Sequence, residues 1–159
     1  MNEPATALSL CSIGRIERNG EHRRVRIDAP YRKGLVGLDG FSHVLVLWWA
    51  IGCDDPEARA LLQVPLPYAP GHTAGVFACR APVRPNPIMT TVCEVLGVDE
   101  EEGIVLVRDI DAFDQTPVVD IKPYYGITDR VQAPRVPAHA EEWPMWFPPE
   151  GVGLDPEEG

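Results

Sequence analysis

The chain has 159 residues, a formal net charge of −10, and a composition that is 45% hydrophobic and 24% charged. This length and composition predict one soluble globular domain and exclude a disordered chain. The longest apolar run spans residues 44–51, far short of the roughly 20 residues that cross a membrane, so no membrane partner is expected. The first eight residues have no basic flank followed by an apolar stretch, which predicts a cytoplasmic protein without a signal peptide.

Proline (17) and glycine (14) are frequent, which disfavours a helical bundle and favours short strands joined by turns. Asn19-Gly20 is a hairpin turn signal, and Asp55-Pro56 supplies the cap and first-turn proline of a short helix. In chain order we expect a flexible leader over 1–8, strands over 12–17, 23–27 and 41–51, a helix over 56–63, and strands over 75–79, 91–98, 104–108 and 117–121.

This order of elements predicts a mainly β fold, a compact single-domain antiparallel β-barrel over 9–140 with one or two short helices. No strand–glycine loop–helix unit occurs, so the fold is predicted to be non-Rossmann. Residues 141–159 form a predicted acidic tail that carries six acids and no basic residue. Its aromatic residues Trp143, Trp146 and Phe147 are expected to cover a sheet edge or a partner surface, which predicts a homodimer.

Seven of the fourteen basic residues lie between Arg15 and Lys33. They form either a phosphate-binding patch or the solvated face of a strand pair. The four cysteines and four histidines show no metal-ligand spacing, so no metal site is predicted.

The segment from Arg80 to Ile88 is the first candidate site. Three prolines hold it extended, so that it presents backbone carbonyls, the Asn86 amide and two guanidinium groups with little loss of entropy on binding. Arginine suits a carboxylate or phosphate because its planar fork donates two parallel hydrogen bonds. A rigid linker with surface arginines is the alternative interpretation.

The second candidate site is the acidic segment from Asp109 to Tyr124. Its carboxylates can accept hydrogen bonds from ribose hydroxyls or an ammonium group, or act as bases. Asp120 lies in an apolar strand and needs a partner, and Lys122 shares its strand face. Asp120 and Lys122 are therefore candidate catalytic residues, although a structural salt bridge explains the pair equally well.

Three motifs occur in the order seen in the TsaA-like family, whose best-known members are S-adenosylmethionine-dependent tRNA adenine methyltransferases of the TrmO type. Gly37-Leu38-Asp39-Gly40-Phe41-Ser42-His43 resembles the first, and Gly75-Val76-Phe77-Ala78-Cys79-Arg80 followed by Arg84-Pro85-Asn86-Pro87-Ile88 resembles the second. The stretch from Asp111 to Tyr124 is similar to the third. The resemblance covers about residues 13–124.

The resemblance implies a β-barrel methyltransferase that binds S-adenosylmethionine, usually as a homodimer, and it makes tRNA a candidate partner. The substrate would be the exocyclic nitrogen of threonylcarbamoyladenosine next to the anticodon. The cofactor-binding residues implied by motif position are Arg80, Asn86, Pro87, Ile88, Thr90, Asp114, Gln115, Thr116 and Pro117. Arg84 is assigned to the methyl acceptor, as a candidate catalytic residue, or to fixing the loop.

The chain departs from the family motifs at several positions. Gln115 replaces a motif glycine, Met89-Thr90-Thr91 replaces Gly-Leu-Ser, and Ile51-Gly52 stands where the family commonly has a histidine. Two alternatives therefore stay open beside the tRNA enzyme. One is a methyltransferase that acts on a small or unknown acceptor, and the other is a non-catalytic, dimer-forming module that binds the cofactor.

Overall fold

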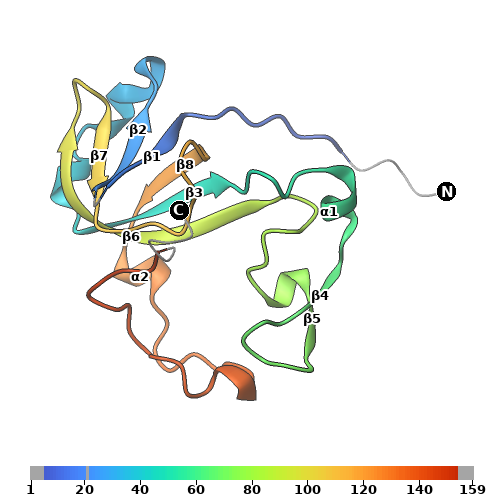
Figure 1. The fold of residues 1–159 in the computed structure, drawn as a ribbon. Helices are drawn as coiled ribbons and strands as arrows, with labels where there is room; N and C mark the ends of the chain where they lie inside the picture. Colours follow the sequence, from blue (N-terminus) through green and yellow to red (C-terminus); the bar gives the residue numbers. More distant parts are fainter. Residues whose placement is uncertain (1–5, 21, 154–159) are drawn as a thin grey trace.

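Six strands close into one antiparallel barrel in the order β1-β2-β7-β6-β3-β8, and β8 pairs with β1 to complete the ring (Figure 1). This computed structural model describes residues 6–20 and 22–153. The predicted fold class is confirmed. The barrel strands are β1 (Gly14–Asn19), β2 (His22–Ile27), β3 (His43–Trp49), β6 (Ile88–Asp99), β7 (Ile104–Val107) and β8 (Pro117–Pro123).

The barrel core is aliphatic and is supplied by alternate residues of each strand. In β3, which lies between β6 and β8, Val44, Val46 and Trp48 are buried and the residues between them are half-buried. The Trp48 indole N–H donates to Thr91 Oγ1 at 3.0 Å, so the polar edge of this ring is satisfied inside the core. The expectation of a central strand in this segment is confirmed.

A β-bulge at Val119 reverses the alternation of β8. The pairing with β3 shifts between Val118 and Asp120, which leaves Val119 as the extra residue. Val118 is buried in the barrel, and Asp120 and Lys122 consequently lie on the outer face of the sheet.

Between β3 and β6 the chain leaves the barrel and forms α1 (Pro56–Ala60), β4 (Gln63–Pro65), β5 (Thr73–Gly75) and the 3-10 turn η3 (Val76–Ala78). The Asp55 side chain caps α1 by accepting from two backbone N–H groups, as predicted. The helix expected over 56–63 ends at Ala60, because β4 begins three residues later. The strand expected over 75–79 is wrong. Residues 76–78 turn instead, and the Arg84 guanidinium binds carbonyl groups of this turn.

Before β3 the chain forms two 3-10 segments, η1 (Ala29–Leu35) and η2 (Leu38–Gly40). After β8 it forms α2 (Gly126–Asp129), runs away from the barrel to η4 (Ala138–Ala140) beside the β4–β5 hairpin, and returns (Figure 1). The three aromatic residues of the predicted tail make separate contacts within the chain: Trp143 with Tyr68, Phe147 with His43, and Trp146 with Arg130.

Residues 6–12 of the N-terminal segment are exposed and extended, whereas residues 1–5 of the predicted leader lie outside the described residues. The same holds for residues 154–159 of the predicted tail. The division into 1–8, 9–140 and 141–159 stays a prediction. Within residues 6–20 and 22–153, no helix is both long and apolar enough to cross a membrane.

Candidate active site

Three clefts contain residues of the predicted site. The first, which we name the Arg80 cleft, has a volume of about 250 Å³ and forms where the end of β3, the start of β6 and two loops meet. The second, the aromatic cleft, has about 490 Å³ and is lined by residues that include Tyr68, His139 and Trp143. The third, the N-terminal cleft, has about 830 Å³ and is lined by residues that include Leu8, Trp49 and Asn86. The Arg80 cleft is lined by residues that include Trp48, Ile51, Cys53, Arg80, Asp111 and Thr116.

Thr116 contributes a buried hydroxyl to the Arg80 cleft. Its side chain has no solvent exposure, and its Oγ1 has no hydrogen-bond partner among the described residues. The backbone around it is fixed, since the Ile16 N–H donates to the Thr116 carbonyl at 2.9 Å. A buried polar group without a partner costs about 1–3 kcal/mol, so this hydroxyl destabilises the ligand-free protein and marks this wall of the cleft as a candidate binding position.

Arg80 supplies the positive charge of the same cleft. Its side chain is exposed, and it makes no hydrogen bond or ion pair with the part of the chain that the structure describes. It lines the aromatic cleft as well. The Arg80 guanidinium is therefore available to bind a carboxylate in a two-pronged manner.

The Cys53 thiol in the Arg80 cleft is not prepared for covalent catalysis. Burial, together with the nearby charges of Asp54 and Asp55, raises the pKa of this thiol above its ordinary value. The thiol therefore stays protonated near neutral pH and is a poor nucleophile. Cys53 is therefore a wall residue of the cleft and not a nucleophile.

Arg84 fixes the turn that carries Arg80. Its Nε donates to the Ala81 carbonyl at 2.8 Å, and its NH2 group donates to the Cys79 carbonyl at 2.6 Å and to the Val76 carbonyl. These three carbonyls surround the half-buried guanidinium. Of the two roles expected for Arg84, the geometry supports fixing the loop.

Asp114 and Gln115 form the tight turn that leads into Thr116. An Asp114 carboxylate oxygen accepts from the Arg18 backbone N–H at 2.8 Å, and this bond holds the pKa of Asp114 below its ordinary value. Gln115 has φ +63°, in the left-handed region that favours glycine. This geometry explains why the family motif has a glycine at this position. The glutamine keeps the same backbone conformation at a cost in conformational energy.

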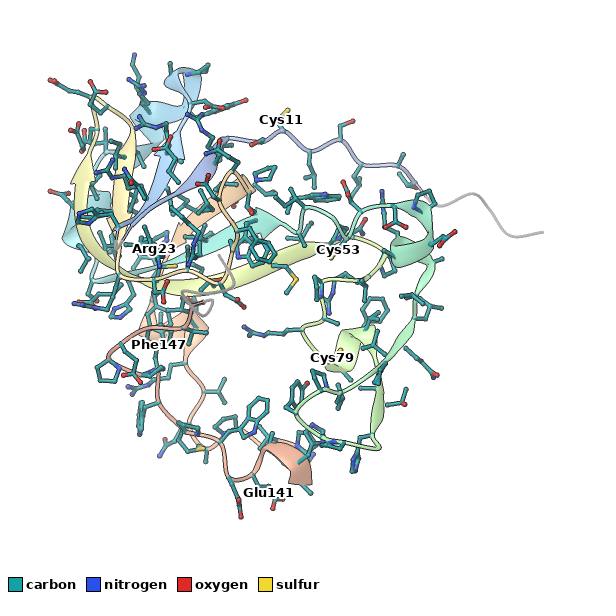
Figure 2. The ribbon with its side chains drawn as sticks, viewed as in Figure 1. Cys11, Arg23, Cys53, Cys79, Glu141 and Phe147 are labelled. Atoms are coloured by element: carbon teal, nitrogen blue, oxygen red, sulfur yellow. The ribbon has the colours of Figure 1, made fainter. Side chains whose placement is uncertain are left out.

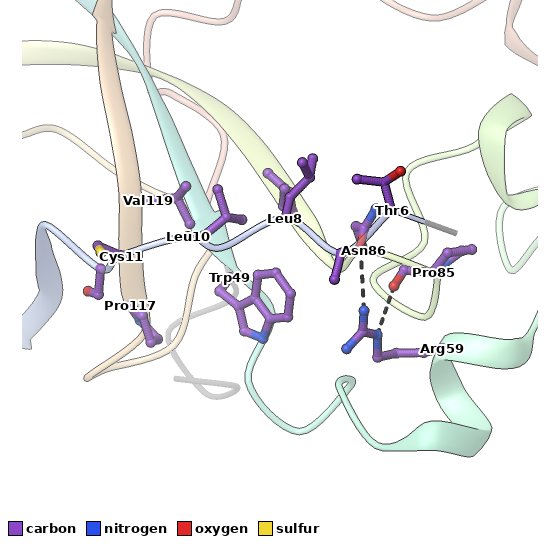
Figure 3. Close-up of a pocket in the computed structure, with 13 residues that line it drawn as sticks. Thr6, Leu8, Leu10, Cys11, Trp49, Arg59, Pro85, Asn86, Pro117 and Val119 are labelled. Atoms are coloured by element: carbon purple, nitrogen blue, oxygen red, sulfur yellow. Dashed lines mark hydrogen bonds between the residues drawn. The ribbon is translucent and has the colours of Figure 1, made fainter. Parts of the chain in front are cut away.

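The remaining predicted cofactor residues lie away from the Arg80 cleft. Asn86, Ile88 and Pro117 line the N-terminal cleft, where Arg59 donates to Asn86 Oδ1 at 3.4 Å (Figure 3). Pro87 is buried, and its carbonyl accepts from the Ala50 N–H at 2.8 Å. Thr90 pairs with Leu47 on the half-buried outer face of the sheet. Of the nine predicted residues, two line the Arg80 cleft and three line the N-terminal cleft, so the structure does not bring all nine into one site.

Asp120 and Lys122 form an exposed ion pair on the outer face of β8, with 2.6 Å between Lys122 Nζ and Asp120 Oδ2. This bond raises the pKa of Lys122. Neither residue lines any of the three clefts. The expected pairing is confirmed, and the catalytic role of these two residues stays a prediction.

Most of the basic stretch between Arg15 and Lys33 is engaged inside the chain. Arg26 binds Glu17 at 2.5 Å, which lowers the pKa of that carboxyl. The other engaged side chains are Arg15 with Glu17, Arg18 with the Ile110 and Ala112 carbonyls, Arg23 with Asp109, and Arg32 with the Glu101 carbonyl. The stretch is therefore mainly a structural feature of the barrel wall.

Residues 14–130 match the family model of the tRNA-methyltransferase O N-terminal domain. The chain belongs to this family. A curated relative from Halobacterium salinarum, named "Probable S-adenosyl-L-methionine-binding protein", is 40% identical over 99 residues, which are 62% of this chain and 73% of the relative. The tRNA (adenine(37)-N6)-methyltransferase of Mus musculus is 38% identical over 98 residues, which are 62% of this chain but 22% of that protein.

The crystal structure of TrmO from Pseudomonas aeruginosa superimposes with a TM-score of 0.65 at 27% sequence identity, over 84% of this chain and 62% of that chain. The chain thus spans less than two thirds of that solved TrmO. Family membership confirms the resemblance stated from the motifs, and with it the expected enzyme class, an S-adenosylmethionine-dependent methyltransferase domain.

Sequence reasoning missed several residues that shape the clefts. Cys53 and Phe113 line the Arg80 cleft, and Tyr68 and His139 line the aromatic cleft. Phe113 lies within the acidic segment but is apolar and was not singled out, and the other three belong to no predicted motif. Only the fold brings these residues together. One signal in the sequence did point to this cleft: Ile51, which stands where the family commonly has a histidine, lines the Arg80 cleft.

Proposed function

We propose that this chain binds S-adenosylmethionine in the Arg80 cleft and methylates the exocyclic nitrogen of threonylcarbamoyladenosine next to the tRNA anticodon. The observation that carries the binding site is that the unengaged Arg80 guanidinium shares one cleft with Thr116, a buried wall residue whose hydroxyl has no partner among the described residues. A zwitterionic ligand with a carboxylate and an apolar arm matches this pair and the apolar walls around it.

Each residue of the site has a distinct role in this proposal. Arg80 binds the carboxylate, Thr116 donates or accepts through its buried hydroxyl, and Arg84 holds the turn that aims Arg80. Asp114 and Gln115 shape the backbone that presents Thr116. Asn86, Ile88 and Pro117 line the N-terminal cleft, which shares no lining residue with the Arg80 cleft, so their cofactor-binding role stays a separate prediction.

Bound S-adenosylmethionine supplies a methyl group on a positively charged sulfur. In the transfer, the acceptor nitrogen forms a bond to the methyl carbon, the carbon–sulfur bond breaks with its electrons remaining on sulfur, and the nitrogen loses a proton to water. The chain's contribution is to hold both reactants in line. Lys122 and Asp120, which face solvent on the outer sheet, are proposed to contact the acceptor and not the cofactor.

We also propose that the protein is a cytoplasmic homodimer. Leu8 and Leu10 are exposed at 86% and 55%, and they lie on the extended segment above Trp49 (Figure 3). Exposed apolar side chains along one segment favour a second protein surface. Light scattering across micromolar concentrations tests this, and a mass equal to one chain throughout would contradict it.

A second candidate acceptor is a small molecule instead of tRNA. The net charge of −10 and the internal pairing of the basic stretch between Arg15 and Lys33 favour it, because RNA binding relies on free positive charge. tRNA binding should weaken steeply as salt rises if phosphates are contacted. Tight binding of a small acceptor with no measurable tRNA binding at low salt would support the small-molecule enzyme.

Two measurements test the proposed function. Calorimetric titration should detect S-adenosylmethionine binding that is weakened by Arg80→Ala and unaffected by Arg24→Ala, a matched arginine on the outer barrel wall. Mass spectrometry of tRNA nucleosides should show the methylated threonylcarbamoyladenosine only in cells that contain the protein. Cofactor binding without any change in tRNA nucleosides would refute the tRNA acceptor and leave the binding site standing.

A further inference from the structure

The aromatic cleft lies beside the Arg80 cleft, and its aromatic rings, Tyr68, His139 and Trp143, belong to none of the family motifs. It is enclosed by the β4–β5 hairpin and its loop on one side and by the segment around η4 on the other. Cys79, which belongs to its wall, and Glu141, which follows η4, mark the two sides in Figure 2. Its volume of about 490 Å³ accommodates a flat bicyclic ring.

The cleft presents aromatic rings that already contact one another. The Tyr68 and Trp143 rings meet edge to face with centroids 5.0 Å apart, and the His139 ring lies 6.0 Å from Tyr68. Tyr68 and Trp143 are 46% and 50% exposed, so each keeps ring surface free for a ligand. Proteins recognise unstacked bases of single-stranded RNA by stacking them on such rings.

The charges around the aromatic cleft select a base in preference to a phosphate. Arg80 is the one arginine or lysine among the described lining residues, and the rest of the wall is mostly apolar. Glu141 and Glu142, both exposed, directly follow η4 in the chain. Their negative charges repel phosphate groups and leave a neutral ring as the favoured occupant.

The two clefts share Arg80 and Pro82 in their walls. An occupant of the aromatic cleft therefore lies next to an occupant of the Arg80 cleft. Methyl transfer needs this adjacency, because donor and acceptor must be held in near-contact.

We propose that the aromatic cleft receives the unstacked purine base of the methyl acceptor, with Tyr68 and Trp143 as its stacking platform. This inference rests on the proposed function. Neither residue touches the methyl donor in this arrangement, and both act by binding the acceptor.

The test compares full-length variants that remove a ring with variants that keep one. Tyr68→Ala and Trp143→Ala should weaken binding of an anticodon stem-loop carrying threonylcarbamoyladenosine, measured with S-adenosylhomocysteine present. We expect a loss of about 5- to 150-fold, which corresponds to the roughly 1–3 kcal/mol of one stacked base. Tyr68→Phe and Trp143→Phe should keep most of the affinity, and all four variants should keep the wild-type affinity for S-adenosylmethionine.

Trp146→Ala is the matched control, because Trp146 is an exposed aromatic residue of the same segment that contacts Arg130 and does not line the cleft. Unchanged stem-loop affinity in both alanine variants, with methylation by the wild type intact, would overturn this proposal and leave the proposed function standing. A wild type that binds S-adenosylmethionine but never methylates or binds the stem-loop would overturn the tRNA acceptor itself. Equal losses of stem-loop affinity in the alanine and phenylalanine variants would also overturn the proposed stacking platform.

Discussion

Replacing Arg84 with lysine tests whether this residue supports the turn or touches the substrate. The guanidinium donates to the carbonyls of Val76, Cys79 and Ala81, whereas a lysine ammonium on a single stem reaches about one of them. Hydrogen bonds to charged groups contribute about 1.5–3 kcal/mol each. Losing two such bonds, at the low end of that range, should lower the free energy of unfolding by about 3 kcal/mol. This loss corresponds to a decrease in Tm of about 6–12 °C for a domain of this size.

The same substitution should weaken cofactor binding indirectly, because Arg80 lies within the turn that Arg84 holds. Differential scanning calorimetry gives Tm, and isothermal titration gives the Kd for S-adenosylmethionine. Arg80→Ala is the comparison, since it should weaken binding while leaving Tm within a few degrees. If Arg84→Lys keeps the wild-type Tm but lowers turnover by about tenfold or more, the guanidinium contacts the acceptor and the supporting role is wrong.

Three further substitutions should change the stability of the fold, two of them raising it and one lowering it in a pH-dependent way. Thr116→Val removes an unpartnered buried hydroxyl, so it should raise the stability of the ligand-free protein by about 1 kcal/mol. The same substitution should weaken S-adenosylmethionine binding, and a wild-type affinity for this ligand would refute the role of the hydroxyl. Gln115→Gly should stabilise by about 0.5–1 kcal/mol in urea unfolding, because glycine adopts φ +63° without strain, and a loss of stability would contradict this. The depressed pKa of Asp114 stabilises the fold above about pH 4, and this stabilisation is lost as pH falls through the folded-state pKa. Asp114→Asn should therefore be less stable than the wild type at pH 7 and equal to it in strong acid, as pH-dependent thermal unfolding would measure.

The barrel strands were predictable because their signals are local. Alternating residues mark β2, and Asn19-Gly20 marks the hairpin that joins it to β1. The Asp55 cap fixed the start of α1 in the same way. These features depend on neighbours in the sequence, so pattern alone identifies them.

The features that failed depend on contacts that strand and helix periodicity do not report. The apolar run over 76–78 has strand character, yet the carbonyl bonds from Arg84 accompany a 3-10 turn. The bulge at Val119 inserts one residue that no alternation pattern reports, so the outer position of Asp120 was not foreseen. The sequence left the arginines between 15 and 33 open between a phosphate-binding patch and a solvated strand face, because partners such as Asp109 of Arg23 lie elsewhere in the chain.

The barrel is closed along its shortest ladder, the seam between β1 and β8, where two positions pair directly. Ile16 extends this seam, since its N–H donates to the Thr116 carbonyl at 2.9 Å and its carbonyl accepts from the Gln115 N–H at 2.8 Å. The loop that lines the Arg80 cleft is thus also the loop that holds the ring shut. We therefore expect a ligand in the Arg80 cleft to stabilise the closed ring as well, and local opening of the ligand-free protein to be easiest at this short seam.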